Sequence, residues 1–396
     1  MTPRRTLIVA AAGIGLVSSL SGAALKQPLA IVEPTTAETS IPPAPAVSEP
    51  DFAPIGDAPV EPREVKPRPG LNVYKATQSG VLSPAVAGIP ERVYVPNSAS
   101  GTVDVIDPAT YEIIAHYWVG AVPHHIAPAW DLSRLYVDAE GSWTLAVIDP
   151  RRGVSVDRIT VPDPYNLYFT PDGTRAIVVA ERLHRLDFRD PHTFQLIRSV
   201  PIPWPGVDHL DFSADGSYLL VSTEYAGTLV KVDTIAMQVT GFVQVGGLPV
   251  DVRLSPDGTV FYVANQGRHG VSIVDPISMT EIGFLKTGRG AHGLAVSRDT
   301  KSLYVSNRLE GTISVIDFES RTVVATWRIG GSPDMLQVSV DGTQLWTTGR
   351  FDGRVYVVDT TSGRLLHTIR VGGEPHGLSY FPNAGRFSLG HNGVYR

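Results

Sequence analysis

Short runs in which apolar residues alternate with polar ones recur along most of this chain. A representative example is Ser255–Asn265, followed closely by Gly270–Asp275, and both are rich in β-branched and aromatic residues. The pair Asp257-Gly258 opens the first run, and Asp-Gly favours a tight hairpin because glycine adopts positive φ without a steric penalty. The pattern therefore predicts antiparallel β-strands joined by tight turns.

The same phrase returns about every 42 residues, the period of a four-stranded propeller blade. The turn position falls at Asp131, Asp172, Asp215, Asp257, Asp299, Asp341 and Asn383. The aspartate that closes a later strand falls at Asp107, Asp149, Asp190, Asp233, Asp275, Asp317 and Asp359. The sequence predicts an all-β fold over residues 71–396, a seven-bladed β-propeller of four-stranded antiparallel blades.

The two ends of the repeat region are expected to share one blade. With strands named A to D from the channel outward, the first repeat opens on a B-like run at Arg92–Asn97, whereas the last A strand, His376–Phe381, comes from the C-terminal end. Joining them closes the ring without a long free edge. A second B-like run, Arg386–Gly390, is surplus, and the sequence leaves open which B-like run completes the shared blade.

The first 70 residues differ in character from the repeats. Residues 1–24 combine Arg4-Arg5, an apolar run from Leu7 to Leu20 and small residues, which predicts a signal peptide and a secreted or cell-envelope location. The alternative is an uncleaved membrane anchor, since the segment from Thr6 to Leu25 is just long enough to span a bilayer. Residues 25–70 are rich in proline and predict a disordered linker.

Composition removes several classes of chemistry. The formal net charge of −6 disfavours binding to nucleic acid or to anionic membranes, both of which require basic charge. The chain has no cysteine, so disulfides, thiolate metal ligands and a cysteine nucleophile are excluded. Phosphate-binding glycine loops, His-Glu-x-x-His and nucleophile-elbow motifs are absent as well. Catalysis has no motif in its favour.

The repeats resemble a known family. The phrases Tyr94–Asn97, Tyr262–Asn265 and Tyr304–Asn307, each followed by glycine and a Val-Ile-Asp type of strand, look like those of YVTN-repeat, YncE-like propellers. The phrases at 163–173 and 206–216 resemble exported actinobacterial members. The resemblance implies the propeller fold but little about function, because such propellers include binding proteins and metal enzymes. DNA binding, associated with YncE-like proteins, is disfavoured here by the acidic charge.

One repeated position carries candidate chemistry. In a propeller the first residues of each A strand surround the mouth of the central channel, and the aligned pairs there are His124-His125, Tyr165-Asn166, Asp208-His209, Val250-Asp251, His292-Gly293, Asp334-Met335 and His376-Gly377. Five of the eleven histidines fall on this rim. The expected ligand-binding residues are His124, His125, Asn166, Asp208, His209, Asp251, His292, Asp334 and His376, and charged loops, including His391, are expected above them.

The rim supports more than one interpretation. Polar side chains there satisfy the exposed edge of strand A, which requires no ligand. Converging imidazoles alternatively suit a divalent transition metal such as Cu or Zn, held by His124, His125, His209, His292 and His376, with the aspartates as second ligands or general bases. The leading hypothesis is an exported module that binds a small molecule, protein or peptide at the channel mouth. A metal-dependent enzyme is the alternative.

Overall fold

The repeated Asp-Gly pairs form the expected turns. Ser255 donates its backbone N–H to Val260 O at 2.8 Å, and Gly258 takes φ +68° between them. The Asp257 carboxylate accepts from the Thr259 N–H at 3.1 Å, which fixes the turn. The A and B strands of a blade are thereby held as a hairpin.

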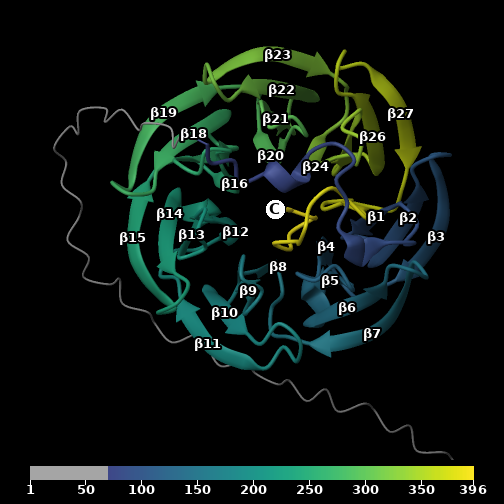
Figure 1. Ribbon diagram of the computed structural model, residues 1–396, viewed down its shortest axis with the longest axis horizontal. Helices are drawn as coiled ribbons and strands as arrows, with labels where there is room; N and C mark the ends of the chain where they lie inside the picture. The colour runs from purple at the N-terminus through teal and green to yellow at the C-terminus, as the bar shows by residue number, and fades with distance from the viewer. Residues whose placement is uncertain (1–69) are drawn as a thin grey trace, which may run out of the picture. The chain divides into compact units, whose positions relative to one another are not determined.

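The structure, a computed structural model, describes residues 70–396 (Figure 1). The predicted signal peptide and the predicted linker up to residue 69 lie outside the described residues. Seven four-stranded antiparallel sheets form the ring. Among residues 70–396, no helix is long and apolar enough to span a membrane.

Six blades are continuous in sequence. Their strands are β4 (Pro123–Pro128), β5 (Leu135–Ala139), β6 (Thr144–Asp149), β7 (Val154–Thr160); β8 (Asn166–Phe169), β9 (Ala176–Ala180), β10 (Arg185–Arg189), β11 (Leu196–Pro201); β12 (Val207–Phe212), β13 (Tyr218–Thr223), β14 (Thr228–Asp233), β15 (Gln238–Gln244); β16 (Pro249–Leu254), β17 (Phe261–Asn265), β18 (Gly270–Asp275), β19 (Thr280–Lys286); β20 (Ala291–Val296), β21 (Ser302–Asn307), β22 (Thr312–Asp317), β23 (Thr322–Arg328); and β24 (Pro333–Val338), β25 (Gln344–Gly349), β26 (Arg354–Asp359), β27 (Leu365–Arg370).

The remaining blade joins the two ends of the described chain, as the repeat count predicts. Its strands are, from the axis outward, β28 (Ser379–Phe381), β1 (Arg92–Asn97), β2 (Thr102–Asp107) and β3 (Glu112–Trp118). The first B-like run therefore completes the blade. Strand β28 is shorter than the predicted His376–Phe381 and pairs only with Arg92–Tyr94, although an isolated bridge links Pro375 to Asn97.

The hydrophobic core lies between the blades. Seven buried apolar clusters each combine residues of two neighbouring sheets. One of them packs Trp346 of β25 against Val93 and Val95 of the shared blade. Because no blade buries both of its faces alone, the ring is stabilised only when it closes.

Two segments outside the blades lie near the channel axis. The strap, residues 71–89, contains the 3-10 helices η1 (Lys75–Thr77) and η2 (Pro84–Val86), and Figure 1 shows it near the axis. It bonds to the turns after the A strands, for example through Val73 N–H to Pro256 O at 2.9 Å. The tail, residues 382–396, also lies near the axis (Figure 1). Two further 3-10 helices, η3 (Glu140–Ser142) and η4 (Glu224–Ala226), lie in loops on the rim side.

Candidate functional site

A register shift at the rim displaces the predicted pairs from the regular ladder. Pro123 pairs with Ala139 and Ile126 with Val137, so His124 and His125 stand opposite Asp138 alone. Strands β12, β16, β20 and β24 carry the same shift at the matching place. Two residues opposite one form a β-bulge, which re-aims side chains. The local geometry thus brings rim side chains from several blades into one small volume.

Hydroxyl groups on the facing strands satisfy the backbone in three of these bulges. Ser222 Oγ accepts from His209 N–H at 3.1 Å, and Ser306 Oγ accepts from Gly293 N–H at 2.8 Å. Thr348 Oγ1 accepts from the Met335 N–H at 3.3 Å. The rim histidine rings are therefore not needed to satisfy these amides.

Three of the rim histidines converge. His125 in β4, His209 in β12 and His376 just before β28 each offer a ring nitrogen, and the three nitrogens lie within 4.8 Å of one another. The ring centroid of His125 is 4.5 Å from that of His376 and 5.0 Å from that of His209. All three residues are buried. We call this group the three-histidine cluster.

The Nε2 atoms of the cluster have no hydrogen-bond partner among the described residues. The Nδ1 atoms lie close to polar groups behind the rings. His376 Nδ1 donates to Asp334 Oδ2 at 2.7 Å, whereas His125 Nδ1 accepts from the Asn392 Nδ2 amino group at 3.0 Å. His209 Nδ1 lies 2.6 Å from Asp208 Oδ1, as an ion-pair contact without hydrogen-bond geometry. At His376 the carboxylate accepts from Nδ1–H and leaves the Nε2 lone pair free, which is the arrangement behind many metal-binding histidines. At His125 the bond from Asn392 places the ring proton on Nε2, so metal binding there requires the Asn392 amide to turn over and accept from Nδ1–H.

The protonation states follow from burial and neighbouring charge. Burial holds the pKa of His125 well below its ordinary value, and the pKa of His376 is lowered by burial and by Arg350. Burial also opposes charge on His209, but the Asp208 carboxylate outweighs it and raises the pKa of His209. Burial raises the pKa of Asp334, yet Arg308, His292 and His376 together hold it well below the usual range. At neutral pH at least two imidazoles of the cluster are neutral, the form that binds metals.

Other predicted rim residues lie outside this cluster. His124 Nε2 lies 3.0 Å from Glu140 Oε2, and His292 is held by Asp334, with Nδ1 2.8 Å from Oδ1, and by Arg308. Asp251 accepts from Arg253 Nη2 at 3.1 Å and from two backbone amides. The Asn166 side-chain amide contacts His391 Nδ1 at 2.9 Å. The predicted five-histidine set therefore divides into three converging rings and two that are paired elsewhere.

Comparison with known proteins agrees with the architecture. The profile of the family described as YNCE-like beta-propeller matches residues 74–386, most of the described chain. The chain belongs to the YNCE-like β-propeller family. No curated protein matches it significantly.

Solved structures resemble this YNCE-like propeller in fold only. A functionally unknown protein from Desulfotomaculum acetoxidans DSM 771 is 19% identical with a TM-score of 0.64, and the match covers 73% of this chain and 98% of that one. Hydrazine synthase of Kuenenia stuttgartiensis is 16% identical with a TM-score of 0.56, and the match covers 64% of this chain and 87% of that one. The dihydro-heme d1 dehydrogenase NirN, in complex with DHE, is 15% identical with a TM-score of 0.59 (77% of each). Such likeness does not transfer function.

The tail of the YNCE-like propeller adds a sixth histidine that the repeat alignment did not place. His391 was expected in a loop above the rim, but its ring centroid lies 4.6 Å from that of His209 and 4.9 Å from that of His125. The tail reaches this position through Gly390, whose φ is +89° and where an added Cβ would meet Leu167 O at 2.3 Å. The glycines around His391 were the one available signal of this tight turn.

Charges of both signs surround the rim of the YNCE-like propeller, where Arg182 Nε pairs with Glu140 Oε1 at 2.9 Å. Acidic groups come from the loops after β5, β9 and β13, where burial and the neighbouring carboxylates raise the pKa of Glu181 to about 8 and that of Glu224 to about 7. Further basic groups come from the loops after β21 and β25, where Arg308 is paired with Asp334 and Arg350 Nη1 has no partner among the described residues. A polar ligand at this face would meet both signs of charge.

Proposed function

We propose that this YNCE-like propeller binds one transition-metal ion through the Nε2 atoms of His125, His209 and His376. The observation that carries the proposal is the meeting of three buried histidines, which have ring nitrogens within 4.8 Å of one another and Nε2 atoms without a hydrogen-bond partner among residues 70–396. A buried polar atom without a partner costs free energy, so three together need an explanation. A shared cation supplies it.

The contacts favour this interpretation over plain lining of the channel. If the rings only shielded the A-strand edge, they would bond to its amides and carbonyls. Those amides are instead satisfied by Ser222, Ser306 and Thr348, and the Ile126 N–H is satisfied by Asn392 Oδ1 at 3.3 Å. The rings of His376 and His125 form hydrogen bonds through Nδ1, and the Nε2 atoms of all three rings have no partner among the described residues.

The donor set indicates the class of metal. Three imidazoles without thiolate or a ligating carboxylate suit Zn or Cu, and three protein ligands leave a coordination position for a further ligand. Asp208 and Asp334 would orient His209 and His376 rather than bind the ion themselves, because both carboxylates already contact ring nitrogens. We also propose that this occurs outside the cytoplasm, on the basis of the signal-like N-terminus.

Metal retention by the untagged full chain tests the proposal. After incubation with Zn(II) or Cu(II) and removal of free metal, elemental analysis should find about one ion per chain. The single substitutions His125→Ala, His209→Ala and His376→Ala should each weaken binding by more than about 100-fold, since even orienting residues contribute 10–100-fold. His192→Ala, at an exposed histidine, is the matched control and should bind as the unaltered protein does.

Two results would reject the site. One is that the unaltered protein, with its fold verified by circular dichroism, retains neither metal. The other is that all three cluster variants bind as tightly as the His192→Ala control.

A metal-dependent enzyme is the second candidate, favoured by Glu181 and Glu224 near the rim, because their near-neutral pKa values suit proton transfer. Two of the similar structures are also enzymes by name. This candidate requires that an external ligand reach the ion. Azide added to the Cu(II)-loaded protein should change its visible absorption; an unchanged spectrum at saturating azide would mean that the ion is closed to substrates.

A further inference from the structure

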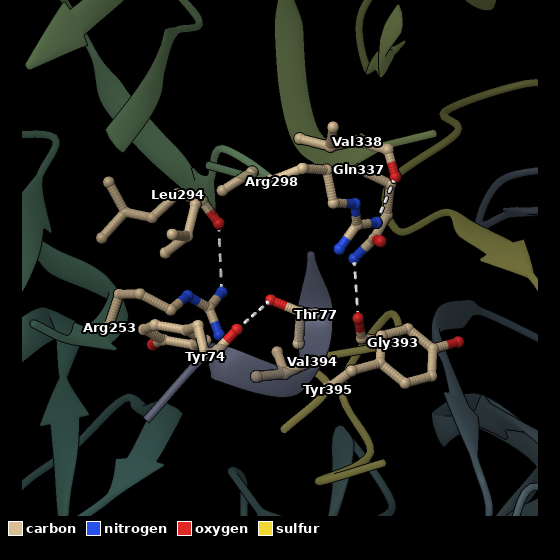
Figure 2. A pocket seen from close by; sticks show the side chains of 12 residues that line it. Tyr74, Thr77, Arg253, Leu294, Arg298, Gln337, Val338, Gly393, Val394 and Tyr395 are labelled. Atoms are coloured by element: carbon tan, nitrogen blue, oxygen red, sulfur yellow. Dashed lines mark hydrogen bonds between the residues drawn. The ribbon is translucent and has the colours of Figure 1, made fainter. Parts of the chain in front are cut away.

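A second polar site lies further along the channel, away from the rim. The A strand β16 carries Asp251, whose Oδ1 lies 3.8 Å from His391 Nε2. Arg253 follows two residues later in the same strand. Successive residues rise about 3.3 Å along a strand, so Arg253 lies roughly 6–7 Å deeper in the channel. There it borders a cavity of about 50 Å³, which we call the axial cavity (Figure 2).

Three separate parts of the chain border the axial cavity, namely the strap, the tail and the A strands β16, β20 and β24. Tyr74 and Thr77 come from the strap, and Gly393–Tyr395 come from the tail (Figure 2). The strap is fixed by Tyr74 Oη, which donates to Leu254 O at 2.9 Å. The cavity therefore lies beside the strap, and its lining shares no residue with the three-histidine cluster.

Arg253, which lines the cavity, carries an unsatisfied donor. Its guanidinium is buried, and Nη2 donates to Asp251 Oδ2 and to Leu294 O, both at 3.1 Å. Its Nη1 has no hydrogen-bond partner among the described residues. A buried cationic donor without an acceptor is costly, which points to a missing partner.

Arg298 contributes a second guanidinium with no carboxylate partner within residues 70–396. It donates only to uncharged oxygens, Ser339 O at 3.0 Å, Val338 O at 2.6 Å and Asn383 Oδ1 at 2.5 Å. Burial lowers the pKa of Arg298 to about 10, so it remains cationic at neutral pH. The matching turn position in the other blades is occupied by Trp130, Pro171, Ala214, Pro256, Val340 and Pro382. Arg298 is thus a departure from the repeat that supplies charge.

The lining of the axial cavity contains these two arginines and no acidic residue. We propose that it binds a small oxyanion, phosphate or a similar group, between Arg253 and Arg298. Guanidinium groups are suited to oxyanions because their N–H donors match two oxygens at once. One water needs roughly 10–15 Å³ of such space, so the cavity has room for about four water-sized groups, the size of inorganic phosphate.

Thermal unfolding of the full chain with inorganic phosphate as the probe tests this site. Metal-free protein in phosphate-free buffer should show a saturable rise of the melting temperature of about 2–5 °C. Sodium chloride at equal ionic strength should not reproduce it. Formate and sulfate, tested in parallel, decide whether the preferred oxyanion is planar or tetrahedral.

Variants assign the effect to the cavity. Arg298→Gln should abolish the phosphate-dependent shift, Arg298→Lys should retain part of it, and Arg152→Gln, at an exposed arginine, should leave it unchanged. If Arg298→Gln does not fold, Arg298→Lys and titration calorimetry of the unaltered protein with phosphate still decide the question. A shift no larger than that of sodium chloride, or one that Arg298→Gln and Arg298→Lys both leave intact, would overturn the proposal. The His125→Ala variant should keep the shift, which separates this site from the metal site.

Discussion

Asp334 contacts two histidines and an arginine at the rim, so replacing it tests how much these charge interactions stabilise the site. Its oxygens lie 2.7 Å from His376 Nδ1, 2.8 Å from His292 Nδ1 and 2.9 Å from Arg308 Nε, and the side chain is fully buried. Asp334→Asn keeps the shape but removes the charge. It leaves the Arg308 guanidinium without its counter-ion and places an amide N–H₂ against donors.

The magnitude follows from the cost of breaking a buried ion pair, about 3–5 kcal/mol. The dependence on pH follows from the sign of the shift. The pKa of Asp334 is held well below its ordinary value by Arg308, His292 and His376 against the effect of burial, so its contribution is complete above about pH 4 and is lost as the pH falls. With an unfolded-state pKa of about 3.9, roughly 1 kcal/mol of the difference between the two proteins should be lost by pH 3.

Urea unfolding of the metal-free proteins, followed by tryptophan fluorescence at pH 7 and pH 3, measures both quantities. The matched control is Glu319→Gln, at an exposed glutamate, which should change the free energy of unfolding by less than about 0.5 kcal/mol. A loss in Asp334→Asn of less than about 1 kcal/mol at pH 7 would refute the reasoning. So would a loss that is the same at both pH values.

Three further changes test separate parts of the account. Asp138 is buried without a partner among the described residues, at a position where three other blades have Ser or Thr, and burial raises its pKa, so its carboxylate destabilises the fold increasingly as the pH rises. Asp138→Ser should therefore raise the free energy of unfolding in urea at pH 7 by about 1–3 kcal/mol, and a decrease would contradict this. The raised pKa of Glu181, about 8, likewise makes folding less favourable as the pH rises from about 4.5 to 8. Glu181→Gln should therefore make the melting temperature depend less on pH across that range, and an unchanged dependence would contradict this. Tyr380 lies in the shared blade, where its aromatic ring packs on Trp346 and its hydroxyl donates to Glu91 Oε2 at 2.6 Å. Tyr380→Ala should lower the free energy of unfolding by about 3–5 kcal/mol, and a decrease below about 1 kcal/mol would show that closure of the propeller does not depend on this packing.

The fold was predictable from the sequence because the repeat supplies the same local information seven times. Each Asp-Gly turn, as at Asp257-Gly258, fixes a hairpin, and the alternation of β-branched residues fixes which side chains are buried. The choice between the two B-like runs was not predictable. It depends on packing of β1 against β2 and of the tail against the channel, and both runs have the same local pattern.

The candidate site was predictable in position but not in detail. Alignment of the repeats placed the rim residues on the A strands, since the bulge recurs in most blades. It could not show that His125, His209 and His376 converge whereas His292 pairs with Arg308, because rotamers and cross-blade contacts have no signal in a single repeat. His391 lies beyond the last repeat, so its arrival beside His209 depends on how the tail folds back.

The most direct test of the metal site is anomalous diffraction from crystals of the protein loaded with Zn(II) or Cu(II), collected at the absorption edge of the metal. The account predicts one strong peak about 2.0–2.2 Å from the Nε2 atoms of His125, His209 and His376. A peak bound instead by His124 or His292, or the absence of any peak in the channel, would contradict it.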